Sequence, residues 1–460
     1  MAVVYGLAAA YAIYCLVTNP AGPITTPDSI RYLDMWPNYP PGYAYFLKLS
    51  GERGAIVAQP LLYAGALALL GREIVRRTGS TVLAAALLIG SMALPQIREF
   101  HASILSESVF LSLLVIFLAL AIRFVHVPSA RTMIEIAIVA GVATMVRRTG
   151  FAFVPVLVVM LLLTQTKFYV AALAPFALLL ALDQAAMKLI HGDNTSSLMG
   201  RHMFAKAALI EAPPSAKARG GEPPAGPSSD PIRAALDEQL EQRFAPIRRM
   251  LASAPPHVGA VLSLYYETCL QGGCADEARA ATGESTEARQ TAVMGTAGLA
   301  RIRRAPWNFL ALTWMHYQSL WTVNRLRHPA IAADLNTFLA SHRPLPYEEL
   351  AMSLGPDRTM AFSGSQIVRY AQYAFFAIAI LTAALAGAGV IAAIGRIQLS
   401  PPIAAAVVAA MTLHAGLLLT ALLAAGFTRF LLGLWPAMVV ACALAYWALI
   451  PGRPWRRTNF

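Results

Sequence analysis

The sequence contains few charged residues: only 13% of its 460 residues are Asp, Glu, Lys or Arg, whereas a soluble domain carries about 25%. Acids are especially scarce, with 24 against 36 basic residues. Hydrophobic residues make up 57% of the chain, and its mean hydropathy is +0.56. This composition excludes a soluble globular protein, a disordered chain and a collagen-like chain.

The net charge of +12 does not indicate a nucleic-acid partner in a chain this apolar. Lys and Arg in the short loops of a membrane protein mark the cytoplasmic side, and we interpret the basic excess as such a topology signal. The partner that the composition predicts is therefore a lipid bilayer.

Cysteines are also few, and they fall into two groups. Cys15 and Cys442 lie in apolar segments and are interpreted as small buried hydrophobic residues. Cys269 and Cys274 lie in the polar stretch CLQGGC. If that stretch is extracytoplasmic, we favour a local disulfide over two free thiols. A zinc site is disfavoured because no second cysteine pair follows at finger spacing.

Motifs for metal and phosphate chemistry are missing as well. The sequence has no HExxH motif, no cluster of metal ligands and no Gly-rich phosphate loop. It therefore indicates no cofactor with certainty and leaves metal dependence open.

Long apolar segments are abundant, and they predict an all-α membrane protein with about ten transmembrane helices. Several segments are shorter than the roughly 20 residues that a span needs, so flanking residues or tilt must supply the rest. The predicted spans are residues 2–17, 54–70, 80–95, 104–125, 132–146, 151–164, 168–186, 366–393, 402–424 and 430–450.

The basic residues of the short loops set the predicted orientation. When ten spans are threaded, these residues all fall on one side, which is then cytoplasmic, and both termini lie inside. Because no basic residue precedes the first span, a cleaved signal peptide is an alternative for that segment. The basic residues that carry this assignment are Arg72, Arg76, Arg77, Arg123, Arg131, Lys167, Arg396, Arg453, Arg456 and Arg457.

The threading divides the chain into three parts. Residues 1–186 form a seven-span half with outer loops 18–53 and 96–103. Residues 187–365 form a long outer region, and 366–460 hold three spans and a basic cytoplasmic tail.

Within the long outer region, a Pro- and Gly-rich linker at 211–231 precedes an amphipathic helix predicted over 232–251. The aromatic, apolar stretch at 305–323 is predicted to be an interfacial helix on the outer leaflet. As a span, it would put the basic tail outside.

The first outer loop carries the most specific pattern, TTPDSIRYLDMWPNYPPGYAYFLKL. Its Asp28, Arg31 and Tyr32 are spaced i, i+3 and i+4, so on a helix they share a face. One interpretation is an ordered amphipathic connector with an aromatic belt. The other is a general base at the membrane surface, because an acid held among aromatic residues suits that role.

The order of a span, PDSxxYL, PPGYxxFL and a second span resembles the GT-C superfamily of integral-membrane glycosyltransferases. Protein O-mannosyltransferases and aminoarabinose transferases of lipid A belong to that class. Three further stretches are similar to segments of the same superfamily, and together these patterns cover about a fifth of the chain. They are HASILSESVFLSLL at 101–114, MVRRTGFAFVPVL at 145–157 and FTRFLLGLWPAMV at 427–439.

The resemblance implies transfer of a sugar from a polyprenyl-phosphate carrier to a glycan, lipid or protein acceptor on the outer face. It also implies a bacterial inner membrane with the active site facing the periplasm. The family's catalytic base maps to Asp28, with Arg31 and Tyr32 as substrate contacts. Ser29 stands where protein O-mannosyltransferases carry a Glu, which argues against a protein Ser/Thr acceptor. Asp34 then becomes a second acid or an orienting residue.

Outer-side arginines are the expected partners of the lipid phosphate, because a guanidinium binds two phosphate oxygens. The candidates are Arg147, Arg148 and Arg429. The alternative for Arg147 and Arg148 is a broken hairpin that turns both of them inward. For Arg429 the alternative is an ion pair with an acid of an outer loop.

Two residues near the second outer loop also have open roles. Glu107 is either a second active-site acid or a carboxylate that the helix dipole favours at a helix start. His101 is either a surface histidine or a substrate contact.

Two rival functions use the same membrane setting. A flippase or transporter of lipid-linked sugars would place ionisable sites near the bilayer midplane. Here the acids cluster at the outer rim, which favours the glycosyltransferase. A polymerase or ligase of surface glycans would use a late outer loop rich in Arg and His. Region 187–365 contains such residues, namely Arg301, Arg303, Arg304 and His316.

Overall fold

The computed structural model describes residues 1–37, 39–192, 199–210, 283–284, 286–321, 366–423 and 428–451. The predicted cysteine pair, the linker and the amphipathic helix at 232–251 lie outside these residues. The described part is all-α and contains no β-strand, only an isolated bridge between Ile24 and Ser103.

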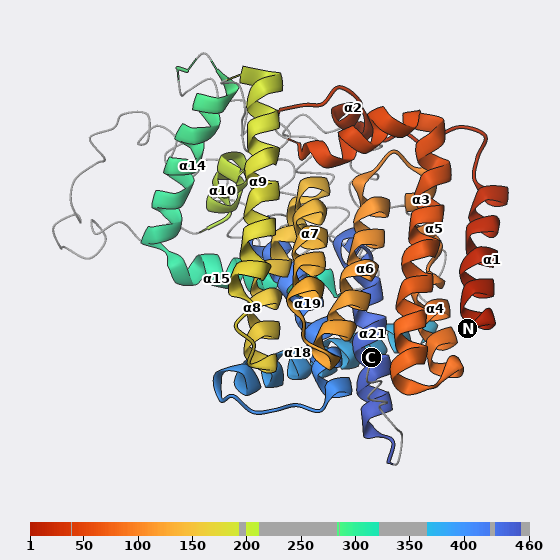
Figure 1. The fold of residues 1–460 in the computed structure, drawn as a ribbon. Helices are drawn as coiled ribbons and strands as arrows, with labels where there is room; N and C mark the ends of the chain where they lie inside the picture. The colour runs from red at the N-terminus through yellow and green to blue at the C-terminus, as the bar shows by residue number, and fades with distance from the viewer. Residues whose placement is uncertain are drawn as a thin grey trace. The chain divides into compact units, whose positions relative to one another are not determined.

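From α1 to α9, short connections join successive helices (Figure 1). In chain order they are α1 (Ala2–Thr18), α2 (Pro27–Leu33), α3 (Pro41–Thr78), α4 (Thr81–Met92), α5 (Pro95–Ala102), α6 (Ser106–His126), α7 (Ala130–Val146), the 3₁₀ turn η1 (Arg148–Ala152), α8 (Phe153–Thr164), α9 (Tyr169–His191), α10 (Met199–Ala208), α14 (Glu287–Arg304), α15 (Pro306–Leu320), α18 (Gln366–Ile394), α19 (Pro401–Leu423), α20 (Thr428–Leu432) and α21 (Trp435–Leu449).

Every apolar segment predicted as a span overlaps at least one described helix, and the protein is an all-α membrane protein. Within the described residues, five helices are long and apolar enough to cross a bilayer, namely α3, α6, α9, α18 from Tyr373 and α19. The pair α4 and α5 adds a sixth if it forms one span bent by 63°. The full count of ten stays a prediction.

The chain forms two compact units. The first comprises Met1–Ile190, Phe376–Leu417 and Leu431–Phe460. The second comprises His191–Phe375 and Leu418–Phe430. In the second unit, α10 packs against α14, and α14 packs against α15.

The first unit is built around α6, which is buried along nearly its whole length. Helices α3, α7 and α21 pack against it, and α1 and α4 pack against α3 (Figure 1). Aromatic stacking closes the centre, with the rings of Phe117 and Phe153 4.3 Å apart. The predicted first outer loop lies at the end of this unit where α6 begins.

Proline begins three helices that lie within or beside the predicted outer loops. Pro27, Pro41 and Pro95 each occupy the first helical position of α2, α3 and α5, where a missing N–H costs nothing. The predicted loop 18–53 therefore contains α2 and the first turns of α3. The predicted loop 96–103 is almost entirely α5. The left-handed Gly51 (φ 66°) breaks α3 between its short outer segment and the apolar part.

The opposite end of α3 and α6 is basic. Glu73, fully buried in α3, pairs with Arg123 of α6 at 2.9 Å and with Arg77 at 3.7 Å. Arg123 also lies 3.6 Å from Glu135 of α7. Glu107 and Arg123 are 16 positions apart on α6, so the two ends are about 24 Å apart at 1.5 Å per residue.

Gly42 allows the start of α3 to touch the end of α7. A Cβ at this position would lie 2.7 Å from the carbonyl carbon of Met145 and 2.8 Å from its oxygen. Backbone atoms cannot move aside as a flexible side chain can. The glycine is therefore required by close packing.

We expect Gly42→Ala to destabilise the protein by about 1–3 kcal/mol, because the added methyl group forces α3 away from α7. Gly65→Ala is the matched control, since nothing lies within 4 Å of a Cβ at this position of the same helix, and alanine favours a helix by up to about 1 kcal/mol. Thermal unfolding in detergent measures both variants. Equal melting temperatures for the two variants would contradict the close packing.

Candidate functional site

The predicted first outer loop, residues 18–53, is tied to the turn between α5 and α6 by main-chain and side-chain hydrogen bonds. Ile24 N–H donates to Ala102 O at 2.9 Å, and Ile104 N–H donates to Ile24 O at 3.0 Å. The buried Ser29 hydroxyl of α2 donates to Ile104 O at 2.8 Å. These bonds fix α2, and with it Asp28, against the start of α6.

Gln59 holds the same turn from the other side. This fully buried residue of α3 donates its amide to His101 O at 2.9 Å and to Ser103 O at 3.1 Å. Its amide oxygen accepts from the Tyr43 hydroxyl at 3.0 Å. The turn between α5 and α6, to which α2 is hydrogen-bonded, is thus anchored to the apolar span of α3.

Asp28 lies in the first turn of α2 with a partly exposed side chain. Its Oδ1 accepts from Arg31 at 3.2 Å and from the Tyr39 hydroxyl at 3.0 Å. Arg31 also donates to the Tyr39 oxygen, and its guanidinium lies 5.6 Å from the centroid of the Trp36 ring. Asp28, Arg31 and Tyr32 therefore share a face of helix α2, as predicted. Tyr39, which follows this helix in the chain, binds Asp28 on the same side.

Tyr32 links Asp28's helix to a second charged pair. Its hydroxyl shares a 2.8 Å hydrogen bond with Ser106, which also accepts from Arg147 at 3.3 Å. Arg147 pairs with the buried Glu107 carboxylate at 2.8 Å. Five sequence-predicted residues thus meet around α2 and the first turn of α6, namely Asp28, Arg31, Tyr32, Glu107 and Arg147.

The two tyrosines stay protonated in this setting. Burial, and after it the nearby Glu107 carboxylate, raises the pKa of the Tyr32 hydroxyl. Burial, and after it Asp28, raises the pKa of Tyr39. Each hydroxyl therefore remains a hydrogen-bond donor over the physiological pH range.

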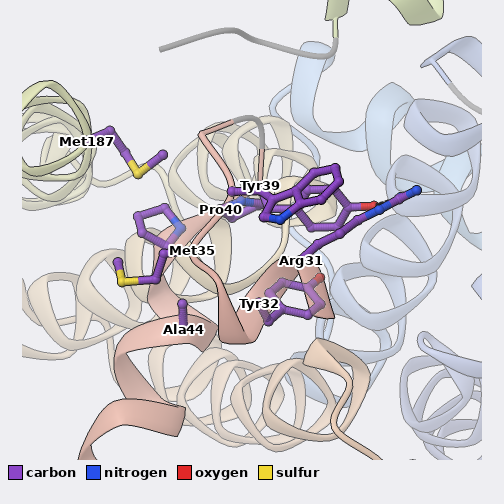
Figure 2. A pocket seen from close by; sticks show the side chains of 9 residues that line it. Arg31, Tyr32, Met35, Tyr39, Pro40, Ala44 and Met187 are labelled. Carbon is purple, nitrogen blue, oxygen red and sulfur yellow. Dashed lines mark hydrogen bonds between the residues drawn. The ribbon is translucent and has the colours of Figure 1, made fainter. Parts of the chain in front are cut away.

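A small pocket opens beside Arg31 (Figure 2). Met35, Ala44 and Met187 lie at one end of it, while Arg31 and Tyr39 lie at the other. The space not filled by atoms is about 170 Å³, part of it continuous with solvent. The side chains leave no enclosed space large enough for a water molecule, so a bound substrate requires the pocket to widen.

Three more residues are predicted for the site, namely Asp34, Arg148 and Arg429. Asp34 is the exposed C-terminal cap residue of α2. Arg148 pairs with the buried Asp183 of α9 at 2.9 Å. Arg429 belongs to α20, in the second unit.

His101 is fully buried, so the expectation of a surface histidine is wrong. Its Nδ1 is 2.6 Å from the Ser108 hydroxyl, and its ring packs edge-on against Tyr11. A substrate contact at His101 therefore has no support from its position.

Several residues of the site carry no signal in the sequence. In the sequence, Gln59 is a single polar residue within an apolar span. Its hydrogen-bond partners are backbone carbonyls 42 and 44 residues away. Tyr39 appears only as one of several aromatic residues of the first loop. Asp183 lies near a predicted span end, yet it is fully buried.

The arrangement offers a carboxylate with a neighbouring guanidinium at the end of a helical bundle. Such a pair can accept a proton and hold an anion in one place. Among the residues with described positions, no three or more His, Cys, Asp or Glu side chains cluster as metal ligands.

We expect Glu107→Gln to destabilise the protein by about 3 kcal/mol, because it removes the carboxylate that compensates the largely buried Arg147. Glu135→Gln is the control, since the Glu135 side chain is 34% exposed and one of its partners, Arg131, is 90% exposed. Its other partner, Arg123, keeps the 2.9 Å pair with Glu73, so we expect the loss to be about 1 kcal/mol or less. Thermal unfolding in detergent measures both. The double variant Glu107→Gln/Arg147→Gln should recover part of the loss, and no recovery would argue against the pair.

Comparison with known proteins leaves the site to be interpreted from its own residues. No protein-family model, no curated protein and no solved structure matches the chain.

Proposed function

We propose that the protein is a glycosyltransferase of GT-C type that moves a sugar from a polyprenyl-phosphate carrier to an acceptor hydroxyl. The observation that carries the proposal is the partly exposed Asp28 carboxylate, held by Arg31 and Tyr39 at the end of the bundle opposite the basic cluster around Glu73. The order of motifs around Asp28 supports the same superfamily.

In the proposed reaction, the acceptor oxygen attacks the anomeric carbon of the sugar. The new C–O bond forms as the bond from that carbon to the phosphate oxygen breaks, and the polyprenyl phosphate leaves with the electron pair. Asp28 accepts the proton of the acceptor hydroxyl. A phosphate is a good leaving group, so no strong general acid is needed.

Arg31 is the cation that best suits the leaving phosphate. Its side chain is 26% exposed beside Asp28, whereas Arg147 is 17% exposed and lies against Glu107. A guanidinium at this point stabilises the developing negative charge. Arg148, 41% exposed, is a second candidate at the start of η1. Arg147 then serves mainly to compensate Glu107.

The pocket beside Arg31 has the character that such a donor needs. Its lining is apolar at Met35, Pro40, Pro41 and Met187, which suits an isoprenoid chain, and charged at Arg31. Binding of the donor would widen the gap between the α2–α3 segment and Met187 of α9. We place the reaction on the outer face of a bacterial inner membrane, opposite the basic loops.

The test is Asp28→Asn, which we expect to abolish transfer while leaving the fold intact, because an amide cannot accept the proton. Asp34→Asn is the matched control, an exposed acid at the end of the same short helix, and it should retain activity within about threefold. The measurement is loss of label from radiolabelled undecaprenyl-phosphate sugars, with purified protein in lipid and a crude membrane acceptor fraction.

Retained transfer by well-folded Asp28→Asn would refute the role of Asp28. Intact lipid-linked sugar in every lane, despite measurable binding to the wild-type protein, would instead favour a flippase. Label that accumulates in long polymers would favour a glycan polymerase or ligase.

A further inference from the structure

Helix α15 presents an exposed aromatic stripe. Trp307 is 79% exposed, Leu310 49% and Trp314 58%. Their spacing of three and four residues puts them on one face of the helix. Trp314 also stacks on Tyr317, with ring centroids 5.5 Å apart. Large apolar side chains gathered in this way mark a surface that contacts something other than water.

The opposite face of α15 is buried within the protein. Leu312, His316 and Leu320 are at most 2% exposed, so the helix is amphipathic in place and its aromatic stripe points outward. With 15 residues, α15 is about 22 Å long at 1.5 Å per residue. That is shorter than the roughly 30 Å hydrocarbon core. A helix of this length, with one face buried and the other exposed and aromatic, suits a position along a bilayer surface.

The charged residues of the chain segment around the stripe have one sign. Arg303 and Arg304 are exposed at the end of α14, directly before α15 begins. No acidic residue occurs from Arg289 to Trp321 in the sequence. Exposed Trp next to Arg is the combination that lies at a lipid headgroup layer, where the indole rings sit at the boundary and the cations face phosphates.

We propose that the exposed face of α15 binds the bilayer surface and that Arg303 recruits an anionic phospholipid headgroup to it. Trp307, Leu310 and Trp314 enter the boundary between headgroups and acyl chains. The chain spans a membrane, so the bilayer is at hand, and the Arg303 charge matches an anionic lipid. This site is independent of the proposed glycosyltransferase activity.

The experiment uses the full-length protein in nanodiscs of phosphatidylcholine alone or of an equimolar mixture with phosphatidylglycerol. A trace of phosphatidylcholine with a diazirine in its acyl chain serves as the probe. After illumination, mass spectrometry locates the labelled peptides. Ile380, 71% exposed on the candidate span of α18, is the positive control in the same sample. Arg289, with its side chain 74% exposed on α14, marks a peptide that should stay unlabelled.

We expect label on the peptide of Trp307 and Trp314, and more of it when phosphatidylglycerol is present. Arg303→Gln should reduce the phosphatidylglycerol-dependent part by about fivefold, since one basic residue near an anionic surface contributes about that factor. Arg289→Gln, the matched control on the same helix, should leave the labelling unchanged.

An unlabelled α15 beside a labelled α18 would overturn the proposal and point to a protein partner on this face. Labelling of α15 that depends neither on phosphatidylglycerol nor on Arg303 would overturn the recruitment of an anionic lipid.

Discussion

The scarcity of charge in an apolar chain imposes one constraint on the whole fold: a buried carboxylate must have a cation within the protein. Outside water, an uncompensated charge costs several kcal/mol. The buried acids of the described residues, Glu73, Glu107 and Asp183, each pair with arginine from another helix or loop. These pairs join α3 to α6, α6 to the α7–η1 junction, and that junction to α9. The charges thus link specific helix ends to one another.

The same constraint separates structural arginines from functional ones. Arg147 stands against the positive-inside rule in the predicted topology, and phosphate binding was one explanation. Its 2.8 Å pair with the buried Glu107 supplies another, since Glu107 would be costly without it. Asp28 and Arg31 form a similar pair, but both side chains are more than a quarter exposed. A pair that can reach solvent can exchange its partners with a substrate, which is why Asp28 carries the functional proposal.

How much of this was predictable depends on the range of the interaction. Long apolar runs locate the helices, because the hydropathy of a segment determines whether it enters the bilayer. The i, i+3, i+4 pattern of Asp28, Arg31 and Tyr32 predicts their shared face, because it is local. The bonds from Gln59 to the carbonyls of His101 and Ser103 are not predictable in this way. A backbone carbonyl has no sequence signature, and the partners lie about forty residues apart.

These long-range bonds decide the geometry of the site. Helix α2 has seven residues, and an isolated helix shorter than about 12 residues is marginal in water. Asp28 therefore owes its position to the contacts that hold α2, above all the Ser29 bond to Ile104 O and the Ile24 bonds to the turn before α6. Gln59 fixes that same turn to α3. A substitution at Gln59 would thus change the position of Asp28 without any direct contact between the two residues. The candidate base depends in this way on an amide buried in a neighbouring span.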